Sequence, residues 1–518
     1  MIGKEHRDWI FTSVFYLPKE RKKMIDCILL DGLVITMDKK RNVIKKGAVA
    51  IDKGKIIYVG DSEEVKVKYS AKEVIVCSNH IIMPGFIDAH GHAGHTAFRF
   101  VVKDTRYWMP AMTHTYKHYV TDDFWYIEGR VSALERVKAG VTTGVCVMGS
   151  QPRCDDPIFA INNAKAYAEV GIRDIVCSGP SHVPWPHNFS RWSGGKRTLY
   201  SVSFEQAVSS LEKVIKTLNN TNGGKTYAYV TPFGMVTSIN PSGATPKEKL
   251  TKLTEHDKLQ AREMLRIAKE YNTRIHSDCF GGMLYLAMQD LDNAVLGPHV
   301  HLQHCSYLSD EEVKILADTG THATAAPGSH APIHRMLDMG VSIAATTDGP
   351  KSGAGLDMFA CMRQFQQAYR EIAQDSNLLP HEKMLELVTI DAAKVVGLDH
   401  MIGSLEVGKC ADIITVNLMN PRLTPNFNPL HSLVMSAQGC DVDNVLVDGE
   451  FVVRDYKVLT VDERTVLTQA QKEAEETIER AKLNGFAYLH NQYWGMARKT
   501  ETEELFDIEW QRQDGGHY

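Results

Sequence analysis

The central part of the chain alternates short apolar β-type segments with helical segments. From about residue 85 to 400 the strand-like segments after the first are VTTGVCVM, IRDIVCSG, YAYVTPF, TRIHSD, HVHLQH, THATAA and VSIAATTD. Segments with helical periodicity separate them, including Asp156–Val170, Phe204–Leu218, Thr254–Tyr271, Leu284–Ala294 and Asp310–Thr319. With the segment before His90 this gives eight strands and their helices, the pattern of a (β/α)₈ barrel in the α/β class.

The segments on both sides of this middle part are rich in β-type residues and turns. Residues 26–84 contain CILLDGLVITMD and GAVAIDKGKIIYVGD, and residues 402–462 contain ADIITVNL and DNVLVDGEFVVRD. We expect both to form one small composite β-sandwich beside a barrel at 85–401. Residues 1–25 are then an N-terminal extension, and 463–518 a helical tail that packs on the outside or on a partner subunit.

Composition excludes several classes of protein. The chain has 58 Lys and Arg against 63 Asp and Glu, a net charge of −5, and its basic residues are scattered, so nucleic acid is not an expected partner. No segment reaches the roughly 18 apolar residues of a membrane helix, and the first residues lack a signal-peptide core. The 10 cysteines form no CxxC pair and fit reduced thiols. We expect a cytoplasmic protein with a small-molecule substrate and no membrane partner.

Three histidines crowd into the segment PGFIDAHGHAGH, directly after an apolar run. Strand residues alternate faces, so His90 and His92 point the same way, into the barrel lumen, with Asp88 below them. Barrel enzymes place their reactive groups at the carboxyl ends of the strands. Two imidazoles on one face at this spacing can reach one metal ion.

Later strands end in residues of the same kind. His276 ends the fifth strand, His304 the sixth and Asp348 the eighth. Imidazoles together with a carboxylate suit zinc or iron(II), and they leave open positions for water and substrate. The sequence therefore predicts a site for a divalent metal ion at the mouth of the barrel.

The same motifs resemble those of the amidohydrolase superfamily over roughly residues 26–460. They are PGFIDAHGH, VKAGVTT, RIHSD, LQHCSYLSDEEVKILADTG, GVSIAATTDG and GSLEVGKCADIITV, in that order. Within the superfamily they are most similar to the branch of cytosine and guanine deaminases, S-adenosylhomocysteine deaminases and triazine hydrolases. The resemblance implies a distorted (β/α)₈ barrel with a composite β-sandwich, and a homo-oligomer of two or more subunits.

The resemblance also implies roles for the residues at these positions. His304 is the residue that orients or polarises the substrate. Members with two metal ions have a bridging lysine on strand four, whereas Lys225 here precedes that strand, so one divalent ion is expected, zinc first and iron(II) second. The implied metal ligands are His90, His92, His276 and Asp348.

One position departs from the branch. The usual HxxE motif, whose glutamate carries a proton, reads His276–Ser–Asp–Cys here, so Cys279 stands at the glutamate position. Asp278 follows at strand spacing and is the first substitute; Cys279 is the second. If neither serves, Asp348, which would accept a proton from the attacking water, and His304 must move the proton between them. Acid–base help of this kind contributes about 10²–10⁴-fold.

Several other histidines near these motifs have less specific interpretations. His95 lies past the strand, where a supporting or solvent role is favoured over a substrate contact. His299 and His301 have the opposite parity to His304, so we expect them on the outer face of strand six. Asp88 is expected to be a buried hydrogen-bonding group.

Two loops carry candidate substrate contacts. Trp108, in the loop after strand one, can cover a flat ring, although packing at the barrel mouth is an equal alternative. His330, in a loop after strand seven, is the second candidate. The segment Ser178–Tyr200 exceeds an ordinary connection and is interpreted as a lid.

These features favour a metal-dependent hydrolase of a carbon–nitrogen bond, in the simplest case a deaminase of a nitrogen heterocycle. An alternative keeps the metal site but cleaves an amide, urea-like or other ring-substituent bond, which the missing glutamate suggests. An alternative of another class is an inactive barrel that serves as a scaffold. The intact set of histidines and Asp348 argues against the scaffold.

Overall fold

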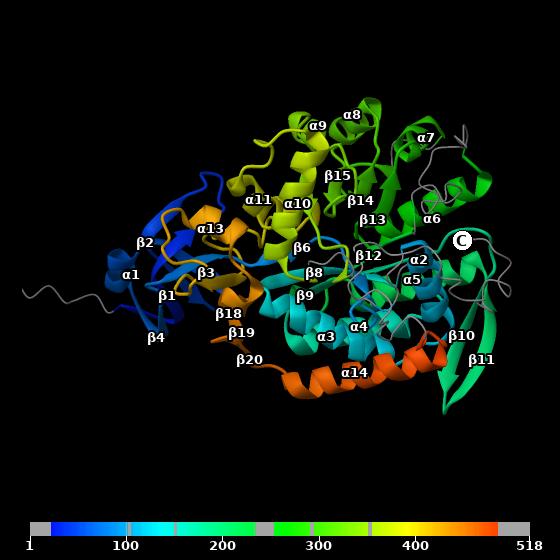
Figure 1. Ribbon diagram of the computed structural model, residues 1–518, viewed down its shortest axis with the longest axis horizontal. Helices are drawn as coiled ribbons and strands as arrows, with labels where there is room; N and C mark the ends of the chain where they lie inside the picture. Colours follow the sequence, from blue (N-terminus) through cyan, green and yellow to red (C-terminus); the bar gives the residue numbers. More distant parts are fainter. Residues whose placement is uncertain are drawn as a thin grey trace, which may run out of the picture.

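The computed structural model describes residues 22–99, 101, 105–149, 153–232, 234, 253–290, 295–350 and 355–484. A parallel barrel with helices around it lies beside a β-rich unit at one end of the molecule (Figure 1). Most of the expected N-terminal extension, and the end of the helical tail, lie outside the described residues.

The barrel consists of parallel strands in the order β6, β8, β9, β12, β13, β14, β15 and β16. Their bounds are β6 (Phe86–Asp88), β8 (Val141–Met148), β9 (Arg173–Ser178), β12 (Thr226–Val230), β13 (Ile275–Phe280), β14 (Val300–Ser306), β15 (His322–Ala325) and β16 (Ile343–Ala345). The short strand β7 (His92–Ala93) pairs with the end of β8. A parallel bridge between Gly91 and Asp348 joins the first strand region to the last. The predicted barrel is confirmed.

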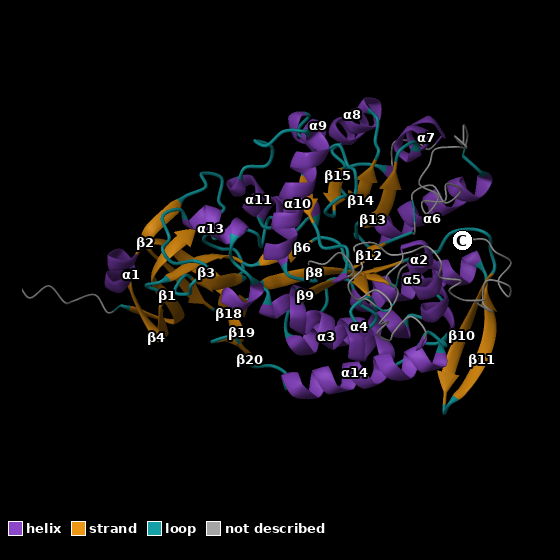
Figure 2. Cartoon of the chain, viewed as in Figure 1, coloured by secondary structure: helices purple, strands orange, loops and turns teal. Residues whose placement is uncertain are grey.

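Helices cover the outside of the barrel (Figure 2). Three of those that the structure describes begin with a capping box, in which Ser203 pairs with Gln206, Thr254 with Asp257 and Ser309 with Glu312. The last of these helices ends at Gly320 in the left-handed conformation. Their bounds are α2 (Thr105–His118), α3 (Phe124–Lys138), α4 (Ile158–Val170), α5 (Phe204–Leu218), α6 (Glu255–Glu270), α7 (Met283–Asp290), α8 (Asp310–Thr319), α9 (Ile333–Asp338), α10 (Met358–Ala373), α11 (His381–Leu387) and α12 (Ile390–Val395).

The β-rich unit is one sheet built from both ends of the described chain. Its strand order is β20, β19, β18, β17, β5, β1, β2, β3, with β4 beside β1. The bounds are β1 (Lys23–Ile35), β2 (Val43–Asp52), β3 (Lys55–Asp61), β4 (Tyr69–Val76), β5 (His80–Pro84), β17 (Ile413–Asn417), β18 (Val442–Val447), β19 (Glu450–Arg454) and β20 (Lys457–Val458), with helix α1 (Ser62–Lys68). Helix α13 (Pro429–Met435) lies between β17 and β18 in the sequence and contacts the helices α10 and α11. Antiparallel pairing of Ile82 with Thr415 joins the two ends. The domain limits given above stay predictions.

The helix α14 (Glu463–Arg480) lies along α3 on the outside of the barrel (Figure 1). Arg130 on α3 donates from Nη1 to Oε1 of Gln469 over 2.9 Å. The described part of the expected helical tail therefore packs on its own barrel. Of the helices that the structure describes, none has both the length and the apolar composition needed to cross a membrane.

Candidate metal centre and active site

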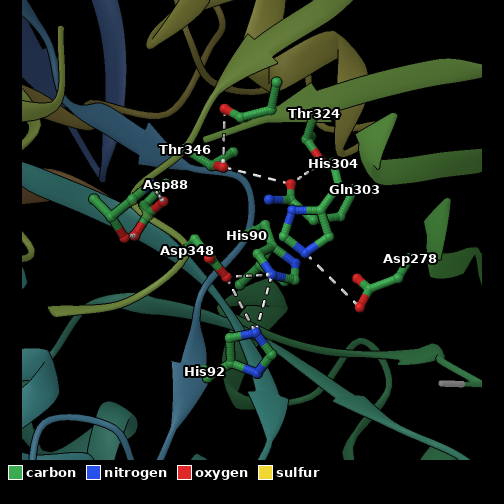
Figure 3. Close-up of polar contacts among 12 residues, drawn as sticks. Asp88, His90, His92, Asp278, Gln303, His304, Thr324, Thr346 and Asp348 are labelled. Atoms are coloured by element: carbon green, nitrogen blue, oxygen red, sulfur yellow. Dashed lines mark hydrogen bonds and ion pairs between the residues drawn. The ribbon is translucent and has the colours of Figure 1, made fainter. Parts of the chain in front are cut away.

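His90, His92 and Asp348 point toward one another where the first and last barrel strands meet (Figure 3). The Nε2 atoms of the two histidines lie 3.2 Å apart, and Oδ1 of Asp348 lies 3.3 Å from Nε2 of His90 and 3.2 Å from Nε2 of His92. Donor atoms at tetrahedral angles around zinc, with bonds of about 2.0–2.1 Å, lie about 3.3 Å apart. The three donor atoms therefore have the spacing of three ligands to one small divalent ion.

The protonation of these imidazoles also suits a metal. Nδ1 of His92 lies 2.7 Å from the carbonyl oxygen of Gly149, and because a carbonyl only accepts, Nδ1 carries the proton and Nε2 keeps its lone pair. Burial is the main cause that lowers the pKa of His90 well below its usual value. Metal binding requires neutral imidazole, and the protein provides it before any ion binds.

Asp348 is held by the backbone as well as by its side chain. Its amide donates to the carbonyl of His90 over 3.2 Å, and it bridges Gly91 in the adjoining segment. Its φ of 62° is left-handed, a conformation that Asp adopts more readily than most residues. The closure of the barrel thus brings a carboxylate from the end of the barrel sequence to the histidines at its start.

His276 lies on the lumen side of β13, directly against His90. Its Nε2 is 2.7 Å from Nδ1 of His90, and its Nδ1 is 3.2 Å from the carbonyl oxygen of His301. That carbonyl accepts the Nδ1 proton, so the Nε2 lone pair faces His90, and burial lowers the pKa of His276 to about 3. Of the four expected ligands, the structure brings three to one point and places the fourth against the opposite nitrogen of His90.

His304 and Asp278 face each other beside this cluster (Figure 3). Nε2 of His304 lies 3.9 Å from Oδ2 of Asp278, and both side chains are partly exposed. With His90 they form a second group whose donor atoms all lie within 4.8 Å of one another. The ring of Phe280 stacks on His304, with 5.4 Å between the ring centroids. The two polar groups are therefore on the more open side of the fully buried His90.

Cys279 is turned the other way. His276 and Asp278 share one face of β13, and Cys279 alternates to the opposite face, in the hydrophobic core. The side chain of Cys279 is fully buried, and its hydrogen bond with Cys305, followed by burial, raises its pKa well above the usual value. The structure brings Asp278, and not Cys279, to the side of the clustered histidines.

The expectation that His301 lies on the outer face of its strand is wrong. Its buried ring stacks on His276 in the lumen, with 4.2 Å between centroids and 21° between planes. The error arises at His304 and Cys305, whose φ values are 67° and 49°, where the register between β13 and β14 shifts. Such a bulge changes the parity of the residues beyond it, so His301 and His304 both reach the lumen.

The two candidate substrate contacts differ in their surroundings. Trp108 is 5% exposed and lies edge-on to His95, and His95 in turn stacks on His92 with 4.4 Å between centroids. Trp108 therefore contacts the ring of His95, which in turn stacks on His92. His330 is exposed and stacks on Tyr307, 5.0 Å between centroids, in the loop after β15.

The long segment after β9 contains a hairpin of β10 (His187–Ser193) and β11 (Lys196–Val202). The buried side chain of Arg153 donates from Nη2 to the carbonyl of Ser190 over 3.2 Å, and from Nε to Asp155 over 2.8 Å. Trp192 donates to the carbonyl of His118 over 2.7 Å. The segment interpreted as a lid is thus a hairpin fastened to α2 and to the loop after β8.

Sequence analysis missed the side chain of Arg136, which reaches from α3 to a point directly behind the metal centre. Its guanidinium lies against Gly91 and Gly144: a Cβ added to either glycine would lie 2.4 Å or 2.6 Å from its nitrogens. A glycine between two ligand histidines and another within an apolar strand indicate a close approach of this kind. That signal was available in the sequence.

Comparison with known proteins identifies the family of this chain. The profile of the amidohydrolase family matches residues 81–452, which is most of the chain. The chain belongs to the amidohydrolase family. It is 29% identical over 470 residues to a 5'-deoxyadenosine deaminase of Methanosarcina mazei, covering 88% of this chain and 99% of the relative. It is 30% identical over 447 residues to a 5-methylthioadenosine/S-adenosylhomocysteine deaminase of Desulforudis audaxviator, covering 84% and 95%.

Solved structures of other amidohydrolases share the fold. An adenosine deaminase of Xanthomonas campestris with bound zinc matches with a TM-score of 0.74 and 19% identity, over 89% of this chain and 100% of that one. An atrazine chlorohydrolase of Arthrobacter aurescens complexed with zinc matches with a TM-score of 0.70 and 19% identity, over 86% and 100%. Family and relatives together identify this amidohydrolase as a metal-dependent hydrolytic enzyme acting on carbon–nitrogen bonds.

Proposed function

We propose that this amidohydrolase is an aminohydrolase that removes the exocyclic amine of an adenosine-derived heterocycle. The observation that carries the proposal is the cluster of His90, His92 and Asp348, whose donor atoms lie 3.2–3.3 Å apart in a chain of this family. The substrate class comes from relatives named as deaminases of 5'-deoxyadenosine, 5-methylthioadenosine and S-adenosylhomocysteine, which match nearly all of their own length.

One divalent ion, zinc in the first place and iron(II) in the second, is the proposed cofactor. His90, His92 and Asp348 would hold it. His276 is the proposed fourth ligand by its place in the motif, and its Nε2 lies 2.7 Å from Nδ1 of His90. When bound, zinc acts as a Lewis acid and makes water nucleophilic near neutral pH.

The chain's own residues would guide the protons. Asp348 accepts a proton from the attacking water at its carboxylate. His304 presents Nε2 to the substrate ring and steadies the charge that develops there. Asp278, whose Oδ2 lies 3.9 Å from that nitrogen, takes up the proton from Asp348 and passes it to the leaving amine, which departs as ammonia. Cys279 takes no part in this scheme because its thiol lies in the core beside Cys305.

The remaining expectations enter the proposal at the rim of the site. His330, exposed in the loop after β15, and Trp108, edge-on to His95, are the proposed substrate contacts. We also propose a cytoplasmic homo-oligomer. Sedimentation of the purified protein tests the assembly, and a species of monomer mass alone would contradict it.

The alternative reaction, hydrolysis of an amide, urea-like or other ring-substituent bond, is favoured by one observation. The position at which the branch has its proton-carrying glutamate is Cys279, and its side chain is fully buried. A leaving group that needs no proton from that position would suit such a site. The scaffold alternative would require a protein that binds no divalent ion.

Ammonia release tests the proposal directly. The zinc-loaded protein is assayed with 5'-deoxyadenosine, 5'-methylthioadenosine, S-adenosylhomocysteine and adenosine, and with amide and triazine substrates in parallel. Asp348→Ala, which removes one donor atom of the cluster, is the matched inactive variant. Ammonia from an adenosine derivative supports the proposal, whereas turnover of only the amide or triazine substrates contradicts it and favours the alternative.

A further inference from the structure

The side chain of Arg136 is a fully buried cation directly behind the metal centre. Nη2 donates to Oδ2 of Asp88 over 2.9 Å and to the carbonyl of Val145 over 3.1 Å. Nη1 donates to the hydroxyl of Tyr167 over 2.7 Å and contacts Sγ of Cys146 at 3.1 Å. Neither partner of the ion pair is solvent-exposed, with relative side-chain exposures of 1% for Arg136 and 0% for Asp88. The guanidinium is therefore held from several sides.

Asp88 links the first strand region of the barrel to the last through hydrogen bonds. It lies two residues before His90, and its carboxylate accepts two hydrogen bonds from Thr347, the residue before Asp348. The Thr347 amide lies 3.0 Å from Oδ1, and the Thr347 hydroxyl lies 2.7 Å from Oδ2. Because the guanidinium holds the same carboxylate, the segments that carry His90 and Asp348 share one buried ion pair.

The two glycines that face Arg136 belong to the same arrangement. Gly91 separates His90 from His92, and Gly144 lies in the adjoining strand β8. A Cβ on Gly91 would lie 2.4 Å from Nη2, and one on Gly144 would lie 2.6 Å from Nη1. The guanidinium therefore packs directly on the backbone between the two clustered histidines, with no side chain in between.

We propose that Arg136 is a positioning residue of the metal centre, which sets Asp348 relative to His90 and His92 through Asp88 and Thr347. This inference rests on the proposed function, since it assumes that the three donor atoms bind a divalent ion. Among the described contacts, the guanidinium bonds to none of the proposed ligands, so Arg136 would act on the ion only through its neighbours. Its effect is on the distance between donor atoms that come from opposite ends of the barrel sequence.

A merely stabilising role is the competing explanation, and the chain contains a matched control for it. Arg173 has a fully buried side chain and donates to Asp412 over 2.8 and 3.0 Å. That pair fastens β9 to the loop before β17, and the hydrogen-bond partners of Arg173 in the described part of the chain include none of the proposed metal ligands. Loss of either arginine leaves a buried carboxylate unpaired and destabilises the fold, but only Arg136 is expected to change the metal centre.

The experiment compares Arg136→Lys, Arg136→Met and Arg173→Met with the wild-type protein, in the full chain. Metal-stripped samples are titrated with Co²⁺ and with Zn²⁺, and the visible spectrum of the Co²⁺ form reports the geometry of the ligands. Both Arg136 variants should bind each ion about 10–100-fold more weakly and show an altered Co²⁺ spectrum. Arg173→Met should melt at a lower temperature but keep wild-type affinity and spectrum.

Tyr167→Phe keeps the test decisive if Arg136→Met does not fold. It removes one acceptor of the guanidinium on α4 and leaves the charge and the metal ligands in place. The expected loss of metal affinity is about two- to tenfold. Wild-type affinity and an unchanged Co²⁺ spectrum in the folded Arg136 variants and in Tyr167→Phe would overturn the positioning role alone. A wild-type protein that binds neither ion would overturn the proposed function and this inference together.

Discussion

The carboxylate of Asp278 and the imidazole of His304 face each other from neighbouring barrel strands, with 3.9 Å between Oδ2 and Nε2. The pairing of β13 with β14 sets Asp278 opposite Gln303, and the bulge at His304 turns its ring to the same side. The distance is longer than a hydrogen bond, as is common for catalytic pairs before substrate closes them. In the proposed reaction this pair would carry the proton that the glutamate carries in the branch, with Asp278 one residue before the glutamate position.

Replacing Asp278 by Asn tests this path. Asn keeps the size of the side chain but cannot carry a proton, so kcat for ammonia release should fall about 10²–10⁴-fold. Zinc content should stay near wild type because Asp278 is not among the proposed ligands. Steady-state kinetics together with metal analysis of the same sample measure both quantities. A kcat within about threefold of wild type would rule out a catalytic role for Asp278.

Cys279→Ser is the matched control, one residue farther along the same strand. Its thiol is buried beside Cys305 on the opposite face, so the change should affect stability more than turnover. We expect kcat close to that of the wild-type protein and a lower melting temperature. A loss of kcat as large as that of Asp278→Asn, without loss of the fold, would move the proton path to Cys279.

Much of this site follows from strand alternation and from the order of the motifs. His90, His92 and Asp348 were predicted as ligands, and the structure clusters their donor atoms. Alternation fails at His304, because a bulge adds a residue and reverses parity, and this error misplaced His301. The alternation of residue types along the sequence does not reveal such a bulge.

Contacts between distant segments were harder to predict. The hairpin β10–β11 is held by Arg153, whose partners come from separate loops, and composition alone did not indicate these contacts. Arg136 was missed for the same reason, since a long side chain from a helix crosses to residues far away in sequence. The sequence shows only the two glycines, Gly91 and Gly144, that leave room for the guanidinium.

Removal of the metal or of one of its ligands gives a second prediction. His90→Ala and Asp348→Ala should each lose bound zinc and all measurable hydrolysis while keeping the barrel folded, as circular dichroism would show. Zinc should raise the melting temperature of the wild-type protein, because a ligand that binds only the folded state stabilises it, by about 2.7 kcal/mol at 100 times Kd. His90→Ala should show no such rise. Zinc-dependent turnover in either variant would contradict the assigned ligands.

The hairpin gives a third prediction. Arg153→Met removes the buried donor to Ser190 and leaves Asp155 without its cationic partner, with the hydroxyl of Tyr200 still donating to that carboxylate, so the hairpin should separate from the barrel mouth more often. Amides of β10 and β11 should exchange with deuterium faster than in the wild-type protein, while those of the β-rich unit, taken as an internal control, should not change. Unchanged exchange in the hairpin would show that Arg153 does not fasten it.

The last prediction concerns Asp174, a fully buried carboxyl group on β9. Burial is the main cause that raises its pKa from 3.8 to about 7, against the opposing effects of Cys146 and Arg136. Between these two pKa values the folded protein holds a proton that the unfolded chain has released, so the contribution of this group to stability is lost as pH rises through that window.

From pH 5 to pH 8 the loss of stability from Asp174 amounts to about 2–3 kcal/mol. Asp174→Asn cannot ionise, so its free energy of unfolding relative to wild type should rise by that amount between the two pH values. Urea unfolding of both proteins at pH 5 and pH 8 measures this difference, in which the titration of all other groups cancels. A difference that does not change with pH would mean that Asp174 titrates alike in the folded and unfolded protein.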